Sequence, residues 1–161
     1  MAEWPVAKGP WEWLGQGIYA WEHAPFRALD WAKQRHGAKA AVVGMVIELD
    51  NDVLDLSDLA AITLLRETYG VLENEYQARG KHVPRNTEKR RDLDCLVINR
   101  LCERLDGNGQ RISAVRGAFE EGERAFTGSM IRAETHVQIA VRDPGIIRGV
   151  FRPTDALRSI S

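Results

Sequence analysis

The segment LGQGIYAWE, residues 14–22, decides the fold of this chain. Its Gly-x-Gly pair, Gly15 and Gly17, leads directly into a short run with strand character that carries Tyr19. Glycine lets the backbone approach a ligand closely, and the tyrosine adds an aromatic face beside that backbone. The segment therefore predicts a strand whose first residues can hold a flat ring. Because a Gly-x-Gly pair alone is common, the elements that follow must support this interpretation.

The remaining sequence predicts one α+β domain with about three helices. Apolar residues recur at helical or alternating spacing, and turn residues separate these segments. We expect strands at 17–22, 40–49, 112–119, 135–141 and 146–151, and helices at 25–37, 57–80 and about 87–105. An irregular segment (1–13), the domain (14–153), a glycine-containing loop inside it (120–133) and a tail (154–161) complete the expected organisation.

Several local features of these elements can be predicted. The apolar segment 40–49 is expected to be a central strand, with Gly44 as a bulge or close-packing point. Ser57 is the expected N-cap of the second helix, and Gly70 is a point where that helix can kink. The two cysteines, at 95 and 102, are too far apart along one helix for an unstrained disulfide, so we expect buried thiols.

Composition narrows the classes of function. With 22 basic and 23 acidic residues the net charge is −1, so no global basic field indicates nucleic acid or a membrane surface. The longest apolar run, 40–47, is too short to span a bilayer, and the N-terminus shows no apolar signal segment. The four histidines lack metal-ligand spacing. We therefore expect a cytoplasmic protein without a membrane partner or a bound metal.

Two further patterns each allow more than one interpretation. Four of the five tryptophans fall within the first 21 residues, where they can pack in the core, stack on a ligand ring or contact a partner protein. The basic run 89–91 can be a solvated helix face or a contact for nucleic acid.

Segment 14–22 resembles the tyrosine motif of the ADP-ribosyltransferase superfamily, in its poly(ADP-ribose) polymerase-like branch. In that family a helix follows the tyrosine strand at once, and a small residue is favoured nine positions after the tyrosine, where this chain has Ala28. Residues 138–147, QIAVRDPGII, are similar to the family's catalytic strand with its following turn and strand. The resemblance covers about 14–50 and 115–151. It implies a split β-sheet with NAD bound in its cleft.

The resemblance also implies how NAD would be held. Tyr19 would stack on the nicotinamide ring, and the backbone at Gly15, Gly17 and Ile18 would approach it. Gln138 falls where the family has its catalytic glutamate and would hold the ribose.

Two arginines are further candidates for contacts with NAD. Arg27 falls on the position of a serine that bonds the carboxamide in the family. Arg116 can bind the pyrophosphate, or can instead be a surface residue or pair with an acid.

The chain departs from the family pattern at the catalytic positions. No histidine precedes Tyr19, although the family's leading strand carries one, so we expect either that this strand is missing or that the given start lies late. Gln138 has no charge with which to stabilise an oxocarbenium-like transition state, so we expect no polymer synthesis. Glu134 is the candidate surrogate, on the same strand face but roughly 13 Å from Gln138 by strand rise.

Other carboxylates and one histidine extend this candidate site. Glu120, Glu121 and Glu123 lie on the loop that recognises the acceptor in the family, so one of them can supply the missing charge. His136 alternates onto the face of Glu134 and Gln138, a row that either lines the cleft or forms a solvated strand face.

Three functions remain open at this point. The first is an NAD-dependent mono-ADP-ribosyltransferase of bacterial toxin, effector or defence type that modifies an intracellular protein or nucleic acid. The second is an inactive ADP-ribosyltransferase-like binding module, and the third is an NAD glycohydrolase. A sheet edge left open by a missing strand would invite an antitoxin or another protein partner.

Overall fold

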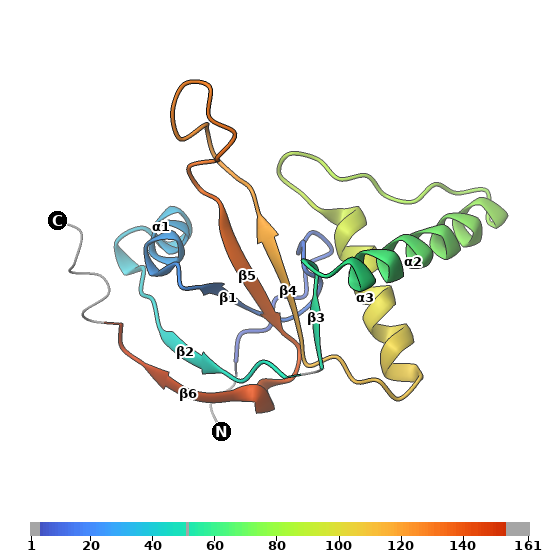
Figure 1. Cartoon of the computed structure of the whole chain (residues 1–161), viewed down its shortest axis with the longest axis horizontal. Helices are drawn as coiled ribbons and strands as arrows, with labels where there is room; N and C mark the ends of the chain where they lie inside the picture. The colour runs from blue at the N-terminus through green and yellow to red at the C-terminus, as the bar shows by residue number, and fades with distance from the viewer. Residues whose placement is uncertain (1–3, 51, 154–161) are drawn as a thin grey trace.

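The computed structural model describes residues 4–50 and 52–153, so the expected tail at 154–161 lies outside the described residues. The described residues form an α+β domain with three α-helices and two sheets (Figure 1). The helices are α1 (Pro25–His36), α2 (Leu59–Ala78) and α3 (Asp92–Gly107). The strands are β1 (Ile18–Glu22), β2 (Gly44–Ile47), β3 (Val53–Asp55), β4 (Ala114–Phe119), β5 (His136–Val141) and β6 (Ile147–Phe151).

The larger sheet has the strand order β1-β5-β4-β3, and β2 pairs with β6 in a second, two-stranded sheet. Strand β5 runs antiparallel to both of its neighbours, whereas β3 and β4 are parallel. The prediction that 40–49 is a central strand is wrong, because among the described residues β2 pairs only with β6, and Val46 is 54% exposed. Gly44 is a close-packing point as expected, since a Cβ there would lie against the ring of Phe151.

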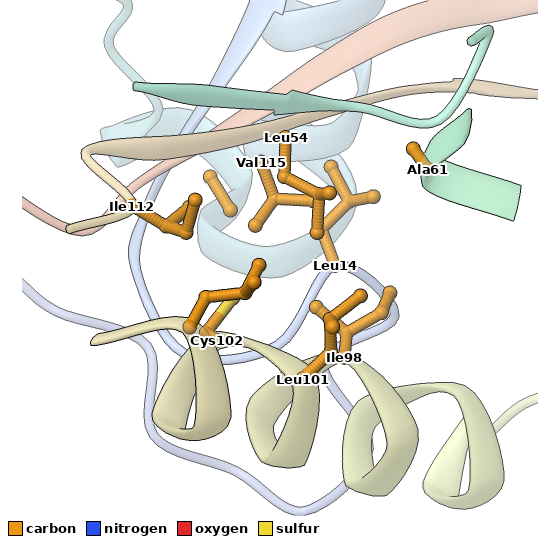
Figure 2. Close-up of a cluster of buried hydrophobic side chains, with 10 residues drawn as sticks. Leu14, Leu54, Ala61, Ile98, Leu101, Cys102, Ile112 and Val115 are labelled. Atoms are coloured by element: carbon orange, nitrogen blue, oxygen red, sulfur yellow. The ribbon is translucent and has the colours of Figure 1, made fainter. Parts of the chain in front are cut away.

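The larger sheet is covered on both faces. Helices α2 and α3 pack on one face, where a cluster that includes Leu14, Leu101 and Val115 is fully buried (Figure 2). The two-stranded sheet packs on the other face through Ile139, Val141 and neighbouring apolar residues. This double cover explains why five of the six residues of β5 are buried, although its sequence alternates polar and apolar residues only in part.

Local hydrogen bonds set the helix ends. Asp58, rather than the predicted Ser57, caps α2 by accepting a bond from the backbone N–H of Ala60. Helix α2 continues unbroken through Gly70. Helix α3 begins later than expected because the oxygen of Asn86 accepts from the N–H groups of its first turn at Leu93 and Asp94.

Both cysteines are buried thiols on α3, as the sequence predicts. Burial raises the pKa of Cys102 to about 11, so this thiol stays protonated at neutral pH. Within the described ranges, no helix has the length and apolar character needed to cross a membrane.

Candidate functional site

The two residues central to the sequence-based prediction share one face of the larger sheet. Antiparallel pairing sets Tyr19 opposite Ala140 and Trp21 opposite Gln138. Because alternate side chains on a strand point the same way, Tyr19, Trp21 and Gln138 lie on one face of two neighbouring strands. This is the face that helices α2 and α3 cover farther along the strands.

Tyr19 is a structural anchor for the Gly-x-Gly loop. Its ring packs against the core cluster beneath α3, and its hydroxyl donates to the carbonyl of Gly15 at 2.8 Å. The same hydroxyl accepts from the N–H of Leu14 at 3.0 Å. Burial raises the pKa of the phenol above its ordinary value, so Tyr19 is a neutral hydrogen-bonding group. The role of its ring against nicotinamide stays a prediction.

The glycines of this loop allow close contacts within the protein. Gly15 has φ of +78°, a conformation that favours glycine, and a Cβ there would lie 2.5 Å from the side-chain oxygen of Asn99. A Cβ on Gly17 would lie 2.9 Å from the carbonyl oxygen of Val141 on β5. Ile18 is buried in the core on the opposite face of the sheet. The close approach predicted for a ligand is therefore made here by the protein itself.

Gln138 is 92% buried and is held by a tryptophan from the N-terminal segment. The indole N–H of Trp13 donates to Oε1 of Gln138 at 2.6 Å. The Trp13 ring packs on Phe119, with 4.5 Å between centroids, and lies over Gly117, where a Cβ would come within 3.2 Å of it. One of the early tryptophans thus forms a wall over the predicted ribose-binding residue.

A cluster of aromatic and polar groups continues along the same face. His136 is 6% exposed, and its ring lies 5.7 Å from Phe119 and 6.4 Å from Trp21 between centroids. Its Nδ1 lies 2.6 Å from the carbonyl oxygen of Glu134, so this nitrogen donates, because a carbonyl oxygen can only accept. His136 and Gln138 are therefore buried, which excludes a solvated strand face for these two residues.

Several buried nitrogens in this cluster lack a hydrogen-bond partner among the described residues. They are Nε2 of His136, the indole nitrogen of Trp21 and Nε of Arg27. Buried polar groups are normally paired, because leaving one unpaired costs about 1–3 kcal/mol. An ordered water or another polar group in contact with these nitrogens would remove this cost.

Arg27 brings the candidate carboxylates together. It projects from α1, its side chain is only 15% exposed, and it contacts Glu121 at 2.7 Å and Glu134 at 3.0 Å. It also pairs with Asp30, at 3.2 Å, one turn along the helix. A cation with two carboxylates forms a charged cluster beside His136, since the backbone carbonyl of Glu134 accepts the bond from that ring. An anionic ligand would have to compete with these carboxylates for Arg27.

Arg116 lies on the opposite face of the sheet from Gln138. It pairs in register with Ile139, and its guanidinium contacts Glu22 of β1 at 2.6 Å and Asp55 of β3 at 2.9 Å. The alternative that Arg116 pairs with an acid is therefore the one that the geometry supports. These two ion pairs, called here the Arg116 ion-pair cluster, connect the edge strands β1 and β3 through a residue of β4.

Acid should weaken the Arg116 ion-pair cluster and so lower the stability of the domain. Asp55→Asn should reduce this loss of stability on acidification. Burial alone would raise the pKa of Asp55, but bonds from Ser57 and Arg116 outweigh it and hold the pKa below its ordinary value. A lowered folded-state pKa contributes stability above the unfolded-state value that is lost as pH falls through the folded-state value. We expect the variant to have a lower Tm at neutral pH and a smaller fall in Tm on acidification.

Melting curves between about pH 7 and about pH 3 test this expectation. Glu67→Gln, an exposed change on α2, is the control and should follow the wild type. Parallel curves for wild type and Asp55→Asn would contradict the account.

Three parts of this region have no local signal in the sequence that assigns them to the site. Neither Trp13 nor Asn99 was singled out as a partner of the predicted site residues, because each acts across more than eighty positions. A third is an apolar cavity of about 390 Å³ between α2, α3 and Trp13. Only the helical spacing of apolar residues on 59–76 pointed to this region, and it predicted a filled core.

No protein-family model, no curated protein and no solved structure matches this chain.

Proposed function

We propose that this protein is an NAD-dependent mono-ADP-ribosyltransferase of bacterial toxin, effector or defence type that modifies an intracellular protein or nucleic acid. One observation carries the proposal: Tyr19 and Gln138 lie on the same face of paired strands β1 and β5, in a domain with two separate sheets. The resemblance requires this relationship, and a different strand order would have removed it.

The chemistry of the surrounding residues fits an NAD molecule. Trp21 pairs in register with Gln138, and His136 lies two residues before it, so both bring an unpaired nitrogen near the amide of Gln138. Arg27 has a further unpaired nitrogen and contacts Glu134. When bound, NAD would supply an ADP-ribosyl group with nicotinamide as the leaving group. Gln138 would hold a ribose hydroxyl, and Arg27 would meet the pyrophosphate in place of one of its carboxylates.

The carboxylates released from Arg27 would then serve the acceptor. Glu134 and Glu121 both contact Arg27, so the two carboxylate groups already lie close together. A freed carboxylate near the site can orient an acceptor nucleophile or stabilise positive charge that develops on the ribose. This assigns the missing charge to residues that precede β5 rather than to Gln138 itself.

Proton NMR of NAD mixed with the purified protein tests the proposal. We expect free nicotinamide to appear with the wild type and to appear about tenfold faster or more with Gln138→Glu, because a carboxylate stabilises the transition state. The glutamate keeps an oxygen for the Trp13 N–H. Gln138→Met removes this acceptor and should abolish release. Gln110→Glu makes the same chemical change at an exposed position and should match the wild type.

The same spectra separate the remaining candidates. A binding module would broaden the NAD lines without releasing nicotinamide, and the engagement of Gln138 by Trp13 and of Tyr19 by its own loop favours this second candidate. An NAD glycohydrolase would yield free ADP-ribose without an acceptor. Unchanged NAD signals with every variant would contradict any role for NAD.

The second sheet supports a protein partner. Within the described residues, β2 and β6 pair only with each other, so each has an open outer edge. Val46, Val150 and Phe151 on these strands are more than half exposed. Open strand edges with apolar side chains are sites where another chain can add a strand, as an antitoxin or a target protein would.

A further inference from the structure

Trp13, which bonds Gln138, also lines an apolar cavity. This cavity measures about 390 Å³, and its walls come from the N-terminal segment and from helices α2 and α3, including Trp13, Leu65 and Val97. Arg66 and Asp94 are the charged residues of its lining. A cavity of this size with apolar walls and a few polar groups is typical of a small-molecule site. Trp13 and Tyr69 in its lining can stack on a flat ring of a ligand.

A second cavity, of about 220 Å³, adjoins the first and has a different character. Tyr69 and Leu93 line both cavities. The second is bounded by the end of α2 and the segment that follows it, which brings Lys81, His82 and Arg85 to its wall. Lys81 and Arg85 are exposed, and neither forms an ion pair among the described residues. Two uncommitted cations beside an apolar cavity attract an anionic group.

Each of the two cavities also has one acidic residue in its lining. The carboxylate of Glu73, in the second cavity, accepts the hydroxyl of Tyr69 at 2.7 Å, which occupies one of its oxygens. Asp94, in the first cavity, can accept from an amino group on a ring, while Arg66 can donate to a ring nitrogen or carbonyl. The apolar cavity therefore offers both hydrogen-bonding partners that a nucleobase edge requires.

The first turn of α3 lies where the two cavities meet. Leu93, which lines both cavities, belongs to this turn, as does the acidic residue Asp94 of the first cavity. Asn86 binds the N–H groups of Leu93 and Asp94 and so fixes the segment after α2 against this turn. The second cavity thus has a defined wall rather than a loose one.

We propose that the two cavities together bind a purine nucleotide, with the base in the apolar cavity and the phosphate beside Lys81 and Arg85. Tyr69 and Leu93, which line both cavities, would contact the sugar. This site is separate from the residues proposed to act on NAD, and it does not depend on that proposal. It touches them at one point, because Trp13 forms a wall of the apolar cavity and binds Gln138.

Calorimetric titration of the full chain with AMP and with adenosine tests the inference. We expect AMP to bind at least about tenfold more tightly than adenosine, since the phosphate adds charge-assisted hydrogen bonds. Lys81→Glu with Arg85→Glu should remove this difference and leave adenosine binding unchanged. Leu93→Trp should weaken the binding of both ligands, because the larger side chain would fill the space where the two cavities meet. Lys89→Glu, an exposed change in the same segment that lines neither cavity, should behave as the wild type.

Further ligands distinguish the sources of the nucleotide. NAD that competes with AMP, and loses affinity in Leu93→Trp, would identify the ligand as the dinucleotide itself, whereas AMP binding without competition would identify a separate mononucleotide. A short single-stranded oligonucleotide that binds wild type and Leu93→Trp with equal affinity would show that Lys81 and Arg85 contact a nucleic-acid backbone. That result would overturn the proposal. Equal binding of AMP and adenosine, or no binding of either by a folded wild type, would also overturn it, even if that protein releases nicotinamide from NAD.

Discussion

Gly17→Ala should destabilise the domain by about 2 kcal/mol or more, because the new methyl group would meet main-chain atoms. The Cβ would lie 2.9 Å from the carbonyl oxygen of Val141 and 3.0 Å from the carbonyl carbon of Ala140. Backbone in the middle of a sheet cannot move aside as a flexible side chain can, so β1 would have to separate from β5. We expect the Tm to fall by about 4–8 °C.

This experiment separates two explanations of the Gly-x-Gly pair. If Gly17 served only a ligand, the alanine variant would melt like the wild type and lose only affinity for NAD. Gly70→Ala is the matched control, because that glycine lies inside α2, where an added Cβ would meet no atom within 4 Å. It should raise stability by up to about 1 kcal/mol, since alanine is the better helix former. An unchanged Tm in Gly17→Ala would contradict the close packing of β1 on β5.

Leu101→Ala should cause a still larger loss of stability, about 3 kcal/mol and within the usual range of about 2–5 kcal/mol for such truncations. Leu101 has no exposed surface and lies in the core cluster between α3 and the larger sheet (Figure 2). Its removal leaves a cavity that neighbouring residues on two different elements cannot both move to fill. Denaturant titration should show a lower midpoint with an unchanged slope, which indicates lost stability without a change of the unfolded state.

Leu59→Ala provides the matched control for this change. Leu59 begins α2 and is 83% exposed, so the same truncation should change stability by less than about 0.5 kcal/mol. Equal losses in the two variants would mean that α3 does not cover the core cluster.

The sequence predicted most elements because each has a strong local signal. The helix after Pro25, the turn at 106–109 and the strands that became β4, β5 and β6 combine clear periodicity with glycine or proline boundaries. The resemblance to the ADP-ribosyltransferase order of elements, together with strand alternation, also implied that Tyr19 and Gln138 share a face. The pairing of β1 with β5 gives them a common face. An α+β domain could therefore be predicted from the sequence alone.

The errors arose where distant residues decide local structure. Segment 40–49 has the pattern of a buried strand, but only the pairing with β6 shows that it forms a sheet of its own. Helix α3 starts late because the side chains of Asn86 and Thr87 offer hydrogen bonds that compete with another helical turn. The pairing of Arg27 with Glu134 joins residues from opposite ends of the chain, and no local pattern encodes it.

The hydrogen bond between Trp13 and Gln138 joins positions 125 residues apart, and within the larger sheet β1 pairs only with β5. During synthesis on the ribosome, β1 therefore cannot pair with its partner until β5, which begins at His136, has been made. Such distant pairing makes folding slow compared with that of a helical bundle of the same length. An incomplete chain that ends before β5 contains neither the paired strand nor Gln138. Any activity of the sheet face that carries Tyr19 and Gln138 can therefore begin only after translation has passed β5.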